Sequence, residues 1–281
     1  MRLVSDSRIY AAFLAAASIL CAAGPTLGKT KLPKPDHVII VMEENHSYSE
    51  IIGNGQALYI NTLADAGALF TQSFAVEHPS QPNYLDLFSG SDQGVTSDDC
   101  PQNFGKTANE ESELIKNKLT FLGYSEGLPG KGSEVCTQGE YARKHAPWTN
   151  FTNDKAKFNL PFTSFPKDFS KLPTVSWVIP DLLDDMHDGT IQEGDTWLED
   201  NFAKYVNWVN AHNSLLIITW DEDDGTEGNQ IPTIFVGPMV KPGQYSEKIN
   251  HYNVLRTIEA MYGLKPMANE KNVQPITDVW Q

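Results

Sequence analysis

The chain has 281 residues, of which 40% are hydrophobic and 10% aromatic, so it is long and apolar enough to fold around a large core. Its 36 acidic residues outnumber its 21 Lys and Arg residues, and the formal net charge is -15. No basic run interrupts this acidic background. A nucleic-acid-binding surface is therefore not expected.

The chain begins with a segment typical of a secretory signal peptide. Arg2 and Arg8 precede an apolar run from Ile9 to Ala23, and small residues follow. We therefore predict a signal peptide at 1–28 and one domain at 29–281, in a secreted or periplasmic protein. The alternative is an uncleaved membrane anchor, but the apolar run is shorter than the roughly 20 residues that a spanning helix needs. No later segment approaches that length, so no stable membrane span is expected.

The remaining elements are predicted from their apolar patterns. Continuous apolar or β-branched runs predict strands at 37–42, 68–76, 174–180, 214–220 and 231–237. Helical spacing predicts helices at 61–67, from Ser80, at 195–212 and at 251–263. Residues 90–159, rich in Gly, Pro, Asn and Ser, are expected to form long surface excursions. Buried strands alternating with helices indicate an α/β three-layer sandwich with a mainly parallel central sheet.

Two cysteines remain once the signal segment is set aside. Cys100 and Cys136 flank a loop-rich stretch with few long apolar runs. Two cysteines in an exported chain predict one disulfide, and a covalent link would stabilise such a stretch.

Acidic and amide side chains follow three of the predicted strands. They are Glu43, Glu44 and Asn45 after the first strand, Asp181, Asp184, Asp185, His187 and Asp188 after 174–180, and Asp221, Glu222, Asp223 and Asp224 after 214–220. Parallel strands bring such residues to one edge of the sheet, where ligands bind. Converging carboxylates repel one another unless a cation lies between them. Oxygen ligands suit Mg²⁺, Ca²⁺ or Mn²⁺, and a histidine ligand would admit Zn²⁺ or Fe. The alternative is that these residues cap helices or face water.

Ser80 has two possible roles in the sequence EHPSQPNYLDLFSG. As a helix N-cap it would satisfy a free backbone N–H group, and Pro82 would then stand in the first turn. As a nucleophile it would use the same helix start, which stabilises negative charge. No G-x-S-x-G elbow surrounds it, so an ordinary α/β-hydrolase is disfavoured, and no phosphate-binding glycine loop is present.

Four histidines stand beside polar or turn residues, namely His78, His145, His187 and His251. Each alone is as expected of a surface or capping histidine. Together with Ser80 and the acidic strand ends, they supply a nucleophile, metal ligands and groups for phosphoryl oxygens. This combination is typical of chemistry at phosphorus.

Six motifs in order resemble the phosphoesterase family of secreted bacterial acid phosphatases and type C phospholipases, within the alkaline phosphatase superfamily. They are Glu44-Asn45, HPSQPNY around Ser80, YARKHAPW around His145, IPDLLDDMHDG around His187, TWDEDDG around Asp221, and INHYNVLRTIEAMYG. The resemblance extends from about His37 to Leu264 and implies an alkaline-phosphatase-like fold.

The resemblance also implies roles for individual residues. Ser80 would form a phosphoseryl intermediate that water hydrolyses. The metal would be held by Glu44, Asn45 and Asp221, with Glu222 as a further ligand. The phosphoryl group would be bound by His78, Asn83, His145 and His187, with Asp185 and His251 as weaker site residues.

The implied activity is an acid phosphatase acting on phosphomonoesters, whose substrate is a small phosphate ester or a phospholipid head group. A phospholipase C-type phosphodiesterase is the first alternative, although no C-terminal lipid-binding extension is apparent. A non-catalytic secreted binding protein on the same fold is the second.

Overall fold

An eight-stranded sheet forms the centre of the computed structural model, which describes residues 31–281 apart from the side chain of Glu270. The strand order is β11-β2-β10-β9-β1-β8-β4-β7, and only β10 runs antiparallel to its neighbours. The strands are β1 (His37–Glu43), β2 (Ala68–Phe70), β4 (Phe121–Ser125), β7 (Asn159–Pro161), β8 (Val175–Ile179), β9 (Ser214–Trp220), β10 (Thr233–Val236) and β11 (Gly243–Tyr245). The predicted mainly parallel α/β sheet is confirmed.

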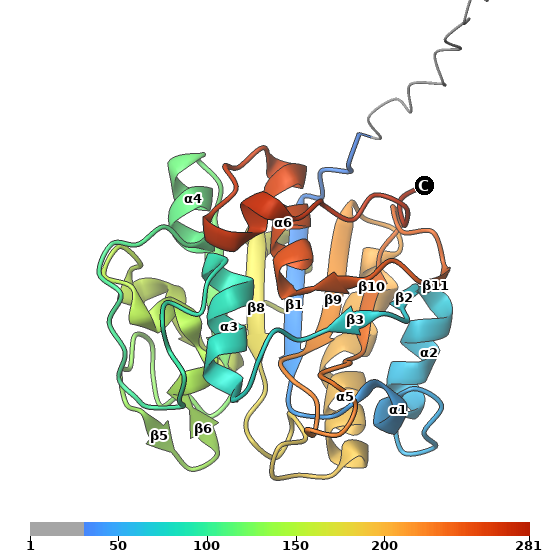
Figure 1. Cartoon of the computed structure of the whole chain (residues 1–281), viewed down its shortest axis with the longest axis horizontal. Coiled ribbons are helices and arrows are strands. Elements are labelled where there is room, and N and C mark those ends of the chain that lie inside the picture. The colour runs from blue at the N-terminus through green and yellow to red at the C-terminus, as the bar shows by residue number, and fades with distance from the viewer. Residues whose placement is uncertain (1–30) are drawn as a thin grey trace, which may run out of the picture. The chain divides into compact units, whose positions relative to one another are not determined.

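Helices cover both faces of this sheet (Figure 1). One face packs against α3 (Ser80–Ser89), α4 (Glu110–Lys116) and α6 (His251–Tyr262), and the other against α2 (Leu58–Ala66) and α5 (Ile191–Val209). The remaining elements are α1 (Tyr48–Ile51), β3 (Ser73–Phe74), β5 (Thr137–Gln138), β6 (Tyr141–Ala142), β12 (Ile249–Asn250) and the 3-10 helices η1 (Arg143–His145), η2 (Pro147–Asn150), η3 (Ala156–Phe158), η4 (Phe162–Ser164), η5 (Phe169–Lys171) and η6 (Ala268–Asn272). The predicted three-layer arrangement is therefore present.

The central strand β1 is buried on both faces. Its side chains alternate, so that Val38, Ile40 and Met42 pack on the α3 and α6 side while Ile39 and Val41 pack on the α2 and α5 side. This double burial explains why its sequence is continuously apolar. The same alternation sends the acidic residues at its end to opposite sides of the sheet.

Two sequence predictions differ from the structure. Residues 68–76 form two strands, β2 and β3, which belong to different sheets because a turn at Thr71 and Gln72 separates them. Residues 90–159 are not only surface excursions, since they form α4 and the strand β4 of the main sheet, and their last residue, Asn159, begins β7. The strand β4 lacks a β-branched run. Its Gly123 is required because a Cβ there would lie 2.2 Å from the Trp148 ring.

Residues 32–281 form one compact unit, and the predicted signal peptide at 1–28 lies outside the described residues. Within the described part of the chain, none of the helices has the length and apolarity needed to cross a bilayer. The predicted disulfide is confirmed, because Cys100 and Cys136 are bonded with an S–S distance of 2.14 Å.

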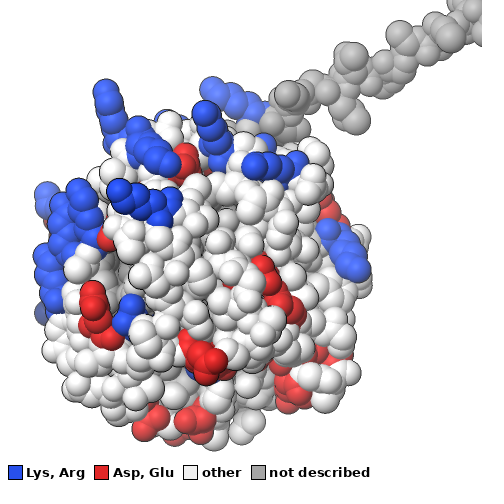
Figure 2. All heavy atoms as spheres, turned by 60° about the vertical axis from the view of Figure 1, so that its left-hand side comes forward, with Lys and Arg blue, Asp and Glu red and all other residues white. Residues whose placement is uncertain are grey.

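Charged side chains are unevenly distributed on the surface drawn in Figure 2. Lys and Arg gather toward the upper and left edges of that view, and Asp and Glu are more frequent toward its lower end. The lower end is the one where β1 terminates in Figure 1. The carboxyl edge of the sheet therefore lies in the more acidic part of this surface.

Glu110 provides a test of how burial affects stability. Burial raises its pKa from 4.5 to about 8, although the indole N–H of Trp177, which donates to Glu110 Oε2 at 2.7 Å, opposes this shift. Because the folded-state pKa is the higher one, folding takes up a proton, and stability is lost as the pH rises from about 4.5 toward 8. We expect Glu110→Gln to be more stable than wild type, with an advantage that grows by about 3 kcal/mol between roughly pH 5.5 and 8.5.

Urea denaturation of both proteins at these two pH values measures this difference. A pH-independent difference would mean that Glu110 remains ionised in the folded protein. Glu113→Gln is the control, because this residue of the same helix has an ion-pair partner, Lys116.

Candidate active site

The site lies where β1 and β9 end side by side. Glu43 pairs with Trp220 in the parallel register, and the Asp221 N–H donates to the Glu43 carbonyl at 3.0 Å. The Glu44 N–H donates to the Asp185 carbonyl at 2.9 Å, which joins the loop after β8 to the same edge. The three acidic segments therefore meet as the strand pattern predicts.

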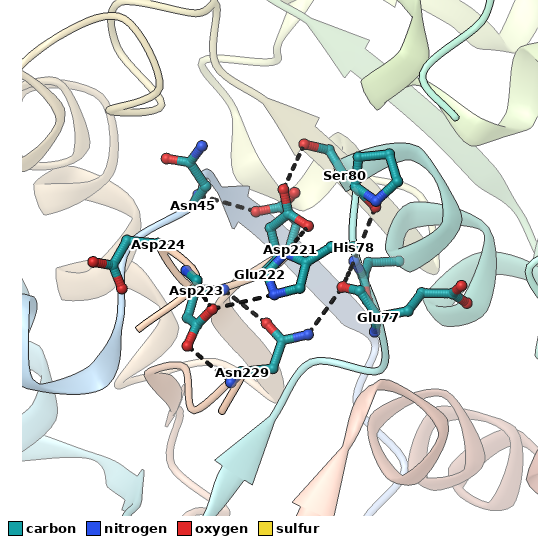
Figure 3. Close-up of polar contacts among 12 residues, drawn as sticks. Asn45, Glu77, His78, Ser80, Asp221, Glu222, Asp223, Asp224 and Asn229 are labelled. Atoms are coloured by element: carbon teal, nitrogen blue, oxygen red, sulfur yellow. Dashed lines mark hydrogen bonds and ion pairs between the residues drawn. The ribbon is translucent and has the colours of Figure 1, made fainter. Parts of the chain in front are cut away.

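Ser80 occupies the first position of α3, directly above this edge. Pro79 is the N-cap, and no side-chain capping bond is present, so of the two roles that the sequence allowed, Ser80 does not have the capping one. Its side chain is buried, and Oγ lies 3.0 Å from Glu44 Oε2. It also lies 3.3 Å from Glu222 Oε1 (Figure 3). The hydroxyl thus faces two carboxylates and the positive end of a helix dipole.

Glu44 is held in place from three directions. It accepts a hydrogen bond from the Tyr84 hydroxyl at 2.6 Å, and His145 Nε2 lies 2.9 Å from the same Oε1 atom. Burial would raise the pKa of Glu44, but His145, together with Lys144, lowers it to about 2. Glu44 is therefore ionised and can bind a cation.

Asp221 provides the observation that tests whether a metal fits. It is fully buried, its Oδ1 accepts the Asn45 N–H at 3.1 Å, and its Oδ2 has no hydrogen-bond partner. Burial, together with the charges of Glu44 and Glu222, raises the pKa of Asp221 well above its usual value. A divalent cation between these carboxylates would satisfy the free oxygen and remove the repulsion. The residues present therefore fit a metal.

Glu222 links Ser80 to a solvent-facing histidine. Its Oε2 lies 2.7 Å from His78 Nδ1, and His78 Nε2 lies 3.3 Å from Asp223 Oδ1. His78 is 46% exposed, so its ring can reach a molecule entering from solvent. Burial raises the pKa of Glu222 to about 7, although His78 opposes the shift.

Asp185 and His251, which sequence placed at the margin of the site, lie directly beneath it. Asp185 Oδ2 is 3.6 Å from His145 Nδ1, and Glu44, His145 and Asp185 form a buried group with ligand atoms within 4.8 Å of one another.

His251 Nε2 lies 2.7 Å from the Asp221 carbonyl oxygen, and burial lowers the pKa of this histidine to about 4. A neutral His251 therefore donates to the backbone that carries Asp221.

Three predicted residues are not placed as expected. The Asn83 amide accepts from Val76 and Glu77 N–H and donates to Glu77 and Pro79 carbonyls, so it supports the loop before Ser80 and is not free to bind phosphate. His187 Nδ1 contacts its neighbour Asp188 at 2.7 Å, and its backbone N–H donates to Asp185 Oδ1 at 2.8 Å. Asn45 reaches the site through its backbone N–H, and Figure 3 shows its side chain turned away from Ser80.

Sequence reasoning missed three residues of the site. Tyr84 stands one helical turn after Ser80, and this spacing could have revealed it.

The other two are Lys144 and Asp98. Lys144 precedes His145 and contacts Asp98 Oδ2 at 2.8 Å, while Asp98 Oδ1 accepts the Gln81 N–H at 2.9 Å. Burial would lower the pKa of Lys144, but Glu44, Asp98 and Asp221 together raise it. No local pattern marks Asp98, because its partners are distant in sequence.

Comparison with known proteins identifies the protein family to which this chain belongs. A model of the Phosphoesterase family matches residues 54–265. The chain belongs to the Phosphoesterase family. This phosphoesterase is 50% identical, over 98% of its length and 95% of the relative, to the phosphatidylinositol-3-phosphatase of Mycobacterium tuberculosis. It is 28% identical, over 72% of its length and 50% of the relative, to an acid phosphatase of Aspergillus fumigatus. It is a phosphoric ester hydrolase.

Solved structures support the fold of this phosphoesterase. A protein of the alkaline phosphatase superfamily from Vibrio parahaemolyticus superposes with a TM-score of 0.61 at 13% identity, covering 86% of this chain and 69% of that one. The 2-O GAG sulfatase BT1596 superposes with a TM-score of 0.62 at 12% identity, covering 88% of this chain and 76% of that one. The expected alkaline-phosphatase-like fold is confirmed.

Proposed function

We propose that this phosphoesterase is a metal-dependent phosphatase that hydrolyses phosphomonoesters through a phosphoseryl intermediate at Ser80. The observation that carries the proposal is the buried Ser80 hydroxyl, which lies within 3.3 Å of both Glu44 and Glu222 at the start of α3. A capping serine would bond its own helix, and this one does not.

The proposed reaction has two displacements at phosphorus. Ser80 Oγ forms a bond to phosphorus as the bond to the leaving oxygen breaks, and the hydroxyl proton passes to a facing carboxylate. Water then attacks the phosphoserine and releases inorganic phosphate. In this proposal His78 donates a proton to the leaving oxygen, and its contact with Glu222 at 2.7 Å supports this role by orienting the ring.

The metal would be held by Glu44 and Asp221, with Glu222 beside them and the Ser80 oxygen as a further ligand. When bound, a divalent ion lowers the pKa of the hydroxyl and stabilises charge on the phosphoryl oxygens. The donor set of carboxylates with a nearby histidine fits Mg²⁺, Ca²⁺, Mn²⁺, Zn²⁺ or Fe.

Two substrate classes can be tested against each other. The relative at 50% identity is named phosphatidylinositol-3-phosphatase, and this favours a phosphomonoester on a lipid head group. The alternative is a phospholipase C-type phosphodiesterase. Phosphate release from phosphatidylinositol 3-phosphate vesicles, set against diacylglycerol release from phosphatidylcholine vesicles, separates them.

The basic test is hydrolysis of a chromogenic aryl phosphate monoester with and without a chelator. Turnover that stops on chelation and returns with a divalent metal supports the proposal. No turnover by the metal-loaded protein on the aryl or the lipid monoester contradicts it.

We expect Lys144→Met to weaken substrate binding without unfolding the protein. Lys144 and the Gln81 N–H both donate to Asp98 beside Ser80, so each can instead donate to an incoming phosphoryl group. Losing one charge-assisted hydrogen bond lowers kcat/KM about 10- to 100-fold, mainly through KM. Steady-state kinetics on the aryl phosphate measure this, with Lys116→Met as the control, because the Lys116 side chain is exposed. A lower Tm with unchanged KM would make Lys144 a structural residue.

We also propose that residues 1–28 direct export and that 29–281 is the mature single domain. The apolar run behind two arginines supports this, as does the disulfide, which persists in oxidising compartments. N-terminal sequencing of the exported protein is expected to begin near residue 29, and a retained segment would contradict cleavage.

A further inference from the structure

A second acidic group lies on the opposite side of the sheet from Ser80. Glu126, Asp181 and Asp184 each offer a carboxylate oxygen within 4.8 Å of the other two. Glu126 follows β4 and Asp181 follows β8, and these strands are neighbours in the sheet. The Asp181 N–H donates to Glu126 Oε2 at 3.3 Å. We refer to Glu126, Asp181 and Asp184 as the β4–β8 acidic group.

Acidic residues often gather without a ligand, so the group needs independent support. Glu43 supplies it. This residue ends β1, the strand beside β8, and the pleat places its side chain on the α5 face. Glu43 is fully buried, and neither carboxylate oxygen has a hydrogen-bond partner. The charges that act on it most strongly are those of Asp184 and Glu126.

A buried carboxylate without any partner is strongly destabilising. Both oxygens of Glu43 lack a partner, and the charges of Asp184 and Glu126 act on them as like charges, so a cation beside Glu43 would be favourable. No basic side chain fills it, because no ion pair joins any of these four residues to a Lys, Arg or His in the described part of the chain. The group therefore has the composition of a cation site.

We propose that the β4–β8 acidic group, together with Glu43, binds a second divalent cation of the Ca²⁺ or Mg²⁺ class. All four donors are carboxylates and none is a histidine or cysteine, which favours hard cations over zinc. Asp184 also lines an open cavity of about 610 Å³ along α5, from which water can complete the coordination shell.

The Ser80 site and the proposed second cation site both follow from the alternation of side chains at the strand ends. Consecutive residues point to opposite sides, so that Glu44 and Asp185 face Ser80 while Glu43 and Asp184 face α5. A cation at the second site would hold together the loops after β4 and β8. The loop after β8 carries Asp185, so this cation stabilises the segment beneath the active site. The inference does not depend on the activity proposed for Ser80.

The test separates the two sites by substitution. Mature protein is treated with chelator, desalted, and melted with and without CaCl₂ and, separately, MgCl₂. The proteins compared are wild type, Asp221→Asn, Asp184→Asn and the double variant. Asp200→Asn is the matched control, because Asp200 lines the same cavity but lies outside the group.

We expect Asp221→Asn to keep a cation-dependent rise in Tm of several degrees with at least one of the two ions. The double variant is expected to lose it, and Asp200→Asn to keep the full wild-type rise. Without cation, Asp184→Asn is expected to be at least as stable as wild type, because an amide removes like-charge repulsion. Equal or higher stability of Asp184→Asn without cation would show that a variant which loses the cation-dependent rise in Tm is still folded.

Two results would overturn the proposal. One is the absence of any cation-dependent rise in Asp221→Asn with either ion. The other is a rise in the double variant equal to that in Asp221→Asn. Phosphatase assays of the same proteins keep the two proposals apart, since Asp221→Asn with full activity would contradict the function proposed for the Ser80 site while leaving the second site standing.

Discussion

Ser80→Ala is expected to lower turnover of an aryl phosphate at least about a thousandfold. Ser80 Oγ is the atom that would bond to phosphorus, and Ala cannot form the phosphoseryl intermediate. The hydroxyl lies between Glu44 and Glu222 and makes no capping bond in α3, so its loss removes little helix stability. Steady-state kinetics and thermal melting of the same preparation measure the two effects.

Ser89→Ala is the matched control for this experiment. Ser89 is buried at the other end of the same helix, and its Oγ donates to the Leu85 carbonyl at 2.9 Å. We expect this variant to retain activity within about threefold, with a modest loss of stability. If Ser80→Ala remained within tenfold of wild type, the assigned nucleophile would be wrong.

Much of the fold could be predicted because buried parallel strands have a strong local pattern. The run at 214–220 coincides with β9, and the run at 37–42 lies within β1. These strands need apolar residues on both faces, so their sequences are continuously apolar. The strand β4 lies in the same sheet but has Gly123 and Ser125 where branched residues would signal a strand, since Trp148 packs against Gly123. Its identity depends on tertiary packing.

The candidate site could be predicted only in part, because some of its contacts also depend on tertiary packing. Acidic residues after parallel strands must meet at one edge, and this rule correctly brought Glu44 to Asp221. The roles of Ser80 and Asn83 depend on which distant atoms face them. Both residues have side chains suited to local bonds, and only the fold shows that Ser80 faces carboxylates while Asn83 supports its own loop.

The direction of a side chain at a strand end was also beyond sequence reasoning. Glu43 and Glu44 are adjacent acidic residues, so the pleat predicts opposite sides of the sheet for them, but the sequence does not tell which of the two faces Ser80. The pleat of β1 places one in contact with Ser80 and the other near Asp184. Under the two proposals, one acidic motif would contribute to both sites, and the alternation of side chains at the end of β1 decides which residue belongs to each.

Asp221→Asn is expected to lower phosphatase activity about a thousandfold or more and to reduce the stabilisation that added metal gives. The fully buried Oδ2 of Asp221 has no partner, and a bound cation is the group that would satisfy it. In chelated buffer the amide removes repulsion from Glu44 and Glu222, so the Tm should stay the same or rise. At a metal concentration about 100 times the Kd, wild type should gain about 2.7 kcal/mol from this site, and the variant should not.

Thermal melts in chelated and metal-containing buffer measure this difference, with Asp224→Asn as the control. Asp224 lies in the same loop but is exposed, and its carboxylate accepts hydrogen bonds from the Thr226 hydroxyl and N–H. That variant should keep both its activity and its full response to metal. Equal destabilisation of Asp221→Asn in the two buffers would instead make Asp221 a structural residue. The metal at Ser80 would then have to depend on Glu44 and the neighbouring His145 and Asp185, whose ligand atoms already lie within 4.8 Å of one another.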